Sequence, residues 1–320
     1  METLHFATSG STGVPKTYAY PPDVLEEEVE AFVPYFADRK RVVSVMPTRH
    51  IFGYVMGTLL PKGLGVPAFL MPPLPVAEFF NALSPGDLLV AFPVFWQAVL
   101  ERFAMRGVRV PDLMGVTASA PCPVELIEKL TRPAPDGEIP YCAAFAEIYG
   151  STETSAIGIR LSPHEPYTLL PIWDKISLTD GSAGITRVRK SGDREPPIPL
   201  PDDVLWYGEN LLVPVKRKDN AVQVGGVNVY PQRVAAVILE HPAVKECVVR
   251  LMRPDEGVRL KAFIVPAETA RERGKEIFNN EFRAWLRERL ETAAIPKSIT
   301  LGDSLPVTAT GKSRDWDTEE

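Results

Sequence analysis

A segment near the start of the chain combines hydroxyl side chains, glycines and a lysine in a pattern that suits phosphate chemistry. It reads ATSGSTGVPK from Ala7 to Lys16. Glycines let a backbone turn tightly and direct its N–H groups at an anion, while hydroxyl groups and a lysine add donors and positive charge. The spacing is not that of the G-x-x-x-x-G-K-[ST] phosphate loop, and a flexible surface loop has a similar composition. The residues that would contact phosphate are Thr8, Ser9, Gly10, Ser11, Thr12, Gly13 and Lys16.

Further segments place nucleotide-binding residue types along the rest of the chain. They read TASAP at Thr117–Pro121, YGSTET at Tyr149–Thr154, RKDN at Arg217–Asn220 followed by GGVNVYP, and LPVTATGKSR at Leu305–Arg314. Each has an ordinary alternative when taken alone: a strand-to-helix turn, a turn with a capping glutamate, a charged linker with a β-turn, or an isolated Gly-Lys pair. The order of the segments along one chain is more informative than any one of them.

In this order the segments resemble the motifs of the adenylate-forming superfamily, which includes acyl-CoA and aryl-CoA ligases, peptide-synthetase adenylation domains and luciferases. The resemblance extends from Ala7 to Arg314. It implies that ATP with Mg²⁺ activates a carboxylic acid as an acyl-adenylate, and that a thiol of CoA or of a carrier protein then displaces AMP. The implied fold is α/β, with a large N-terminal domain whose mixed sheet is covered by helices and a small α+β C-terminal domain.

The resemblance assigns roles to residues of the first two segments. The residues of the first segment would hold the β- and γ-phosphates of ATP. Ser119, Ala120 and Pro121 would lie along the adenine, because small side chains let a planar ring approach the backbone closely.

The segment that begins at Tyr149 is the more specific of the short matches. The family places its aromatic residue, here Tyr149, on the adenine face, and Gly150 and Ser151 continue the nucleotide-binding motif. Thr152 would contact the α-phosphate. Glu153 would bind Mg²⁺, an ion that prefers a carboxylate together with phosphate oxygens.

The last two segments carry the residues that the family uses at its hinge and for adenylation. Arg217 matches an arginine that contacts ribose and phosphate, Asp219 matches the pivot of the hinge, and Lys312 matches the lysine that reaches the carboxylate and the α-phosphate. Such a lysine stabilises the charge that builds up while pyrophosphate leaves. The chain departs from the family at Lys216, where a glycine is usual, and at Gln223, where a lysine is usual.

Two further assignments are less direct. The family carries a ribose-binding aspartate in a T-G-D motif some distance before the hinge. Gly192–Asp193 has the glycine but lies rather far upstream. Asp202 and Asp203 lie at a better distance but lack the glycine, and of these we favour Asp202. His50 resembles the residue that lines the family's acyl pocket, and a structural role at the start of an apolar helix is equally compatible with the sequence.

The elements that must position these residues follow from apolar periodicity. Strands alternate with helices in the first part of the chain, which predicts a parallel or mixed sheet whose carboxyl edge binds ligand. Strands are predicted at 41–46, 66–71, 88–91, 222–229, 244–252, 259–265 and 298–301, and helices at 51–60, 76–83, 94–106, 232–240 and 276–290. The pattern changes near the hinge, so we expect an AMP-binding domain at 1–217 and a mobile lid domain at 220–320.

Composition limits the classes of protein. The chain has 320 residues, 45% of them hydrophobic, and a net charge of −6, which predicts a folded protein that does not bind nucleic acid. No signal peptide or membrane span is visible, and the scattered cysteines Cys122, Cys142 and Cys247 fit small core residues in a reducing cytoplasm.

The remaining expectations concern partners. The family usually has an N-terminal subdomain before the phosphate loop, and its absence here predicts uncovered apolar surface and a possible homodimer. Net acidity disfavours an acidic carrier protein, although a basic patch at Arg102, Arg106 and Arg109 would favour one. The alternative to an enzyme is a non-catalytic nucleotide- or acyl-binding relative that acts as a partner subunit.

Overall fold

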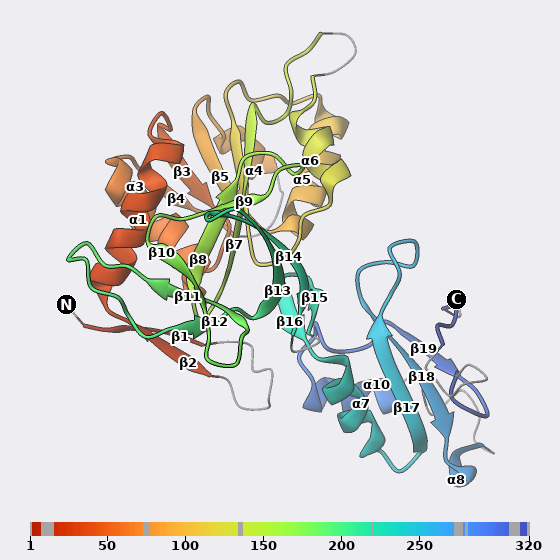
Figure 1. The fold of residues 1–320 in the computed structure, drawn as a ribbon. Coiled ribbons are helices and arrows are strands. Elements are labelled where there is room, and N and C mark those ends of the chain that lie inside the picture. Colours follow the sequence, from red (N-terminus) through yellow and green to blue (C-terminus); the bar gives the residue numbers. More distant parts are fainter. Residues whose placement is uncertain are drawn as a thin grey trace. The chain divides into compact units, whose positions relative to one another are not determined.

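Two compact units make up the chain. The structure is a computed structural model that describes residues 2–7, 16–72, 77–133, 137–218, 221–271, 278, 281–306 and 314–318 (Figure 1). Contacts between Cα atoms divide the chain into an N-terminal unit, Met1–Asp219, and a C-terminal unit, Asn220–Glu320.

A nine-stranded mixed sheet forms the centre of the N-terminal unit, in the order β13-β14-β9-β8-β7-β6-β5-β3-β4. The strands from β4 to β7 in this order are parallel, and those from β8 to β13 are joined antiparallel. Their bounds are β3 Arg41–Ser44, β4 Ala68–Leu70, β5 Asp87–Ala91, β6 Met114–Thr117, β7 Ala144–Ser151, β8 Ser155–Arg160, β9 Tyr167–Leu169, β13 Asp202–Tyr207 and β14 Leu211–Arg217.

Helices cover both faces of this sheet because successive strand residues point to opposite sides. In β5, Leu88 and Val90 join one apolar cluster, and Leu89 and Ala91 join another. The first cluster includes side chains of α1 (Pro22–Phe36), α2 (Ile51–Tyr54), the π-helix η1 (Val55–Leu59) and α3 (Leu60–Leu64). The second includes α4 (Ala77–Ala82), α5 (Pro93–Arg106) and α6 (Val124–Thr131) (Figure 1).

Smaller sheets complete the N-terminal unit. A hairpin of β1 (Leu4–Ala7) and β2 (Thr17–Tyr20) flanks the predicted phosphate loop. The strands β10 (Trp173–Ser177), β11 (Ala183–Arg187) and β12 (Ile198–Pro199) form an antiparallel sheet.

The C-terminal unit is an α+β structure with a core of its own. Its three-stranded sheet has the order β17-β18-β19. Ile238 of α7 and Phe282 of α10 pack in one apolar cluster with residues of this sheet. The bounds are β15 Val222–Val224, β16 Val227–Val229, α7 Pro231–Leu239, β17 Val244–Leu251, β18 Leu260–Pro266, α8 Glu268–Arg271, α10 Glu281–Arg289 and β19 Ser298–Leu301.

The fold class is confirmed, and most predicted elements are present with ends shifted by a few residues. The strand predicted over 222–229 is wrong in one respect: it is a hairpin, because Gly225 and Gly226 have φ of 60° and 81° and reverse the chain. Of the predicted helix 276–290, the structure describes Phe278 and the helix α10, Glu281–Arg289. No helix among the described residues is both long and apolar enough to cross a lipid bilayer.

Candidate active site

The turn between β7 and β8 carries Thr152 and Glu153. It follows the carboxyl end of β7, and the Ser119–Pro121 stretch follows the carboxyl end of the neighbouring parallel strand β6, where Thr117 is opposite Glu147. Both segments therefore lie at one edge of the sheet, the edge where open α/β sheets bind ligands. A bulge at Tyr149 and Gly150 begins the turn. A Cβ atom on Gly150 would lie 2.1 Å from the Ser155 carbonyl oxygen, so the turn requires glycine there.

The β1–β2 hairpin lies against this turn. Tyr20 is buried, and its hydroxyl group donates a hydrogen bond to the Thr152 carbonyl oxygen at 2.7 Å. Burial, and to a smaller extent the charge of Glu153, raise the pKa of Tyr18 in the same strand. Since Ala7 is paired with Thr17, the described ends of the phosphate-loop segment lie together in this hairpin.

The phosphate-loop residues themselves cannot be placed. Thr8, Ser9, Gly10, Ser11, Thr12 and Gly13 lie outside the described residues. Lys16 is described and exposed at the start of β2. Their contacts with phosphate therefore stay predictions.

Tyr149, Asp202 and Arg217 come together from distant parts of the sequence. The Tyr149 hydroxyl group donates a hydrogen bond of 2.6 Å to Oδ2 of Asp202. Asp202 pairs with Arg217 across β13 and β14. Burial and the nearby Asp202 carboxylate raise the pKa of Tyr149, so the phenol keeps the proton that it donates. The arrangement joins the predicted adenine-facing residue to two predicted ribose and phosphate contacts.

The other aspartates considered for the ribose differ in their surroundings. Asp202 is buried, whereas Asp203 is exposed. Asp193 is exposed, and its carboxylate accepts a hydrogen bond from the Ser191 hydroxyl group at 2.7 Å within a local turn. The geometry is therefore more favourable for Asp202, and the ribose contact itself stays a prediction.

A partly buried ion pair that the sequence did not predict supports the predicted adenine segment. Glu147 accepts a hydrogen bond of 2.7 Å from Nε of Arg160, and the Arg160 guanidinium lies 4.5 Å from the centre of the Tyr167 ring. Burial raises the pKa of Glu147, while Arg160 and the Cys122 backbone N–H oppose that rise. Because Cys122 follows Pro121 directly, Glu147 fixes the end of the segment.

Ser119 has a φ of 75°, a left-handed conformation that is unusual for a residue other than glycine. Ser119 and Pro121 are exposed and Ala120 is half-buried, so the backbone of this segment faces open space at the sheet edge. A flat ring could approach it there, as the sequence predicts for adenine.

His50 precedes α2 and is exposed. Partial burial of its ring and the neighbouring charge of Arg49 lower its pKa, so the imidazole is neutral at pH 7. Nearby, the Tyr54 ring packs against Phe6 of β1 with ring centres 5.6 Å apart. The role of His50 in an acyl pocket stays a prediction.

Asp219 and Lys312 lie outside the described residues. The described residues on either side of 307–313 are joined by hydrogen bonds to each other and to the rest of the C-terminal unit. The Arg314 N–H donates a hydrogen bond of 2.8 Å to the Pro306 carbonyl oxygen. Asp315 accepts hydrogen bonds from Arg253 at 2.7 Å and from Arg250 at 3.1 Å.

A lysine completes this anchor. Lys261 of β18 is fully buried, with Nζ 2.7 Å from a Glu256 carboxylate oxygen and 3.1 Å from an Asp315 oxygen. The anchor fixes the chain just beyond the segment that contains Lys312.

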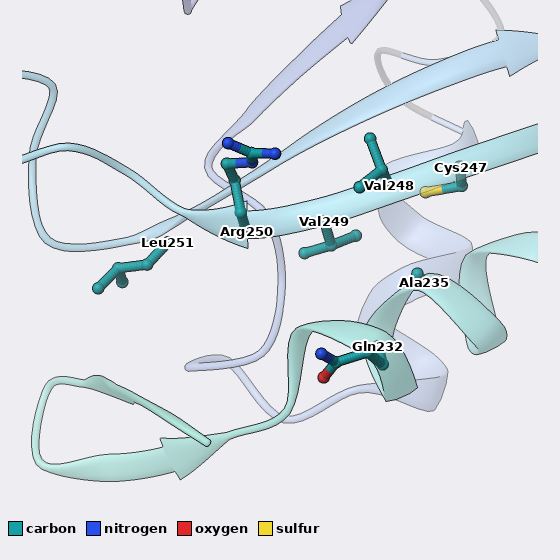
Figure 2. A pocket seen from close by; sticks show the side chains of 7 residues that line it. All are labelled: Gln232, Ala235, Cys247, Val248, Val249, Arg250 and Leu251. Atoms are coloured by element: carbon teal, nitrogen blue, oxygen red, sulfur yellow. The ribbon is translucent and has the colours of Figure 1, made fainter. Parts of the chain in front are cut away.

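The C-terminal unit also has a cavity of about 590 Å³ between α7 and β17 (Figure 2). It is lined by Gln232, Ala235, Cys247, Val248, Val249, Arg250 and Leu251. Burial raises the pKa of the Cys247 thiol to about 12, so this cysteine is not a nucleophile at neutral pH. None of the residues predicted for the active site lines this cavity.

Family models match most of the chain. Residues 6–180 match the model described as AMP-binding enzyme, and residues 233–312 match that of the AMP-binding enzyme C-terminal domain. The 4-coumarate–CoA ligase of Halorhodospira halophila is 32% identical over 97% of this chain and 74% of its own length. The 4-coumarate–CoA ligase of Rhodobacter capsulatus is 35% identical over 98% of this chain and 75% of its own length.

Solved structures share the fold. The amide bond synthetase McbA of Marinactinospora thermotolerans aligns with a TM-score of 0.74 and 20% identity, over 97% of this chain and 67% of that protein. An o-succinylbenzoate CoA synthetase of Bacillus subtilis aligns with a TM-score of 0.73 and 21% identity, over the same shares of the two chains. At these identities the likeness concerns the fold alone.

Proposed function

The chain belongs to the family of AMP-binding enzymes and is an AMP-forming acid–thiol ligase, and from this premise we propose that it converts a compact aromatic or apolar carboxylic acid into its CoA thioester. The observation that carries the proposal is the hydrogen bond from Tyr20 to Thr152. It holds the turn with Thr152 and Glu153 against the hairpin whose strands flank the predicted phosphate loop.

The first half-reaction is adenylation. A carboxylate oxygen of the acid attacks the α-phosphorus of ATP, the bond to the β-phosphate oxygen breaks, and pyrophosphate leaves. Thr152 would contact the α-phosphate, and Lys312 would stabilise the charge that develops there. Tyr149, Asp202 and Arg217 would hold the adenosine, so catalysis is largely positioning and charge neutralisation.

Glu153 fits a Mg²⁺ site in which phosphate oxygens of the substrate supply the other ligands. It is a half-buried carboxylate at the ligand-binding edge of the sheet. The ion, when bound, would neutralise phosphate charge. Among the described residues no three His, Cys, Asp or Glu side chains cluster to hold a metal on their own.

The second half-reaction transfers the acyl group. The thiol sulfur attacks the acyl carbonyl carbon, the bond to the AMP oxygen breaks and AMP leaves, while the proton of the thiol passes to solvent. We favour CoA as the acceptor because Arg109, part of the basic patch considered for a carrier protein, already pairs with Glu138 at 2.6 Å and covers the Tyr141 ring at 4.1 Å.

The acid class rests on His50, Phe52 and Tyr54 and on the similar proteins that are named 4-coumarate–CoA ligases. A neutral imidazole and aromatic rings suit an apolar acid with few polar groups. The test is ATP–pyrophosphate exchange with a panel of aryl, short-chain and long-chain acids, followed by assay of the CoA thioester. We expect exchange with aryl acids first; exchange with long-chain fatty acids alone would contradict the acid class, and no exchange at all would contradict the activity.

A further inference from the structure

A buried ion pair contacts the residues that follow Thr152 and Glu153. Glu28 of α1 is completely buried, and Arg187 at the end of β11 is 2% exposed. Their side chains are joined by a contact of 3.3 Å between Oε2 of Glu28 and Nη2 of Arg187. The two residues are far apart in the sequence and belong to different elements of the N-terminal unit.

Both members of the pair bind the backbone or side chains of the turn. Oε1 of Glu28 accepts a hydrogen bond of 2.7 Å from the Ser155 hydroxyl group and one of 3.3 Å from the Ala156 N–H. Nη2 of Arg187 donates a hydrogen bond of 3.1 Å to the Thr154 carbonyl oxygen. The three residues that follow Glu153 are therefore all held by one buried pair.

The turn needs such support because its backbone is strained. Ser155 has a φ of 58°, a left-handed value that a side chain disfavours unless the surroundings enforce it. Trp173 also holds this backbone in place. Its Nε1 donates a hydrogen bond of 2.7 Å to the Ala156 carbonyl oxygen, and the centre of its ring lies 4.3 Å from the Arg187 guanidinium carbon.

Stability alone does not explain an ion pair at this place. Removing two charges from water is costly, and well-packed apolar residues often stabilise a protein as much or more. What an apolar pair would lack is the set of hydrogen bonds to Thr154, Ser155 and Ala156.

We propose that Glu28 and Arg187 are positioning residues of the ligase, which set the place of Thr152 and Glu153 by holding the turn. This inference rests on the proposed function, since it concerns the same nucleotide site. Glu28 and Arg187 touch the turn and act on the reaction only through it.

The chain offers a matched control. Glu27 and Arg189 join the same helix to the segment just after β11, with 2.9 Å between Oε2 and Nε. Arg189 also pairs with Asp23 and Glu195, and none of the hydrogen bonds of this pair in the described chain goes to the turn. Glu27→Gln therefore weakens a link between the same two segments without touching Thr152 or Glu153.

The experiment measures the dependence of ATP–pyrophosphate exchange on Mg·ATP concentration for the wild type and for Glu28→Gln, Glu27→Gln and Glu153→Gln, together with the unfolding temperature of each. We expect Glu28→Gln to raise the half-saturating Mg·ATP concentration and lower the maximal rate, each on the order of 10-fold, because a small misplacement of binding groups is costly. Glu153→Gln should have the larger effect and Glu27→Gln should stay within about twofold of the wild type.

A purely structural role predicts a different result. It would lower the unfolding temperature and the amount of active enzyme while leaving the half-saturating concentration unchanged, and that outcome would overturn the proposal. If Glu28→Gln does not fold, the double variant Glu28→Met/Arg187→Met supplies the test, since an apolar pair keeps the core filled.

The proposed function can fail separately. If the wild type shows no exchange with any acid, the thermal protection that Mg·ATP gives each protein is the readout. Loss of protection in Glu28→Gln but not in Glu27→Gln supports the positioning role, and equal protection in both contradicts it.

Discussion

At the residue scale, Tyr149 and Asp202 join two segments that lie 53 residues apart in the sequence. The bond occupies one carboxylate oxygen of Asp202 and leaves the other for a further donor. Arg217 stands opposite Asp202 in the neighbouring strand. A ribose hydroxyl group is a donor of the required kind, so the arrangement suits the nucleoside rather than the phosphates.

Asp202→Asn tests this assignment. The amide keeps the shape and can still accept the Tyr149 hydrogen bond, but it removes the charge, so we expect the KM for ATP to rise on the order of 10- to 100-fold. The preference for ATP over 2′-deoxy-ATP and 3′-deoxy-ATP in the exchange assay should shrink at the same time. Asp203→Asn, which changes the exposed neighbour, is the control, and equal effects of the two substitutions would contradict the assignment.

At the element scale, apolar periodicity predicted the strands β3, β4 and β5 of the central sheet, because burial determines which strand residues are apolar, but it did not predict β7, β8, β9, β13 or β14. It did not reveal the pairing of Glu28 with Arg187, which lies 159 residues away. One signal was present: Glu28 shares the buried face of α1 with Leu25, Val29 and Phe32, and a carboxylate on an apolar face needs a partner. The identity of that partner follows only from the three-dimensional fold.

The same limit applies to the candidate site. Short motifs indicated Tyr149, Thr152 and Glu153, since these residue types recur at fixed spacing. The supports of the motif, such as Tyr20 and the Glu147–Arg160 pair, have no fixed spacing and come from other elements. Sequence patterns therefore predict the groups that would touch a ligand better than those that hold them in place.

The anchor of the C-terminal residues on β17 and β18 should respond to acid. Burial alone would raise the pKa of Asp315, but hydrogen bonds from Arg253 and Lys261 outweigh it and hold the pKa well below its usual range. The stabilisation is therefore present above the pKa of the unfolded chain, near 3.9, and is lost as the pH falls below that value.

We accordingly expect the unfolding temperature of the wild type to fall steeply below about pH 4, and the fall to be smaller in Asp315→Asn. Differential scanning calorimetry between pH 3 and pH 7 measures both curves. Asp317→Asn is the control because Asp317 is exposed and, among the residues that the structure describes, pairs with Arg253 alone. If the unfolding temperatures of the wild type and Asp315→Asn fall identically with pH, the anchor does not depend on this carboxylate.

At the scale of the whole molecule, each unit carries a different part of the predicted chemistry. The predicted nucleotide contacts Tyr149, Asp202 and Arg217 lie in the N-terminal unit, and the segment with Lys312 belongs to the C-terminal unit. The units divide at Asp219, the residue predicted to be the pivot. We therefore propose that the C-terminal unit rotates between the two half-reactions, as the resemblance to adenylate-forming enzymes implies.

The two half-reactions should then respond to opposite substitutions. Lys312→Ala should abolish formation of acyl-adenylate but still pass a synthetic acyl-adenylate to CoA, because the lysine is required only for adenylation. Asp219→Pro should make acyl-adenylate but little thioester, because proline fixes φ and restricts rotation at the pivot. Single-turnover assays of each step separate the two effects.

Two variants are the controls and should retain both steps. They are Lys297→Ala, at an exposed lysine, and Asp219→Ala, which leaves φ free. If Lys312→Ala slows both half-reactions equally, one arrangement of the two units serves both steps and the rotation is wrong.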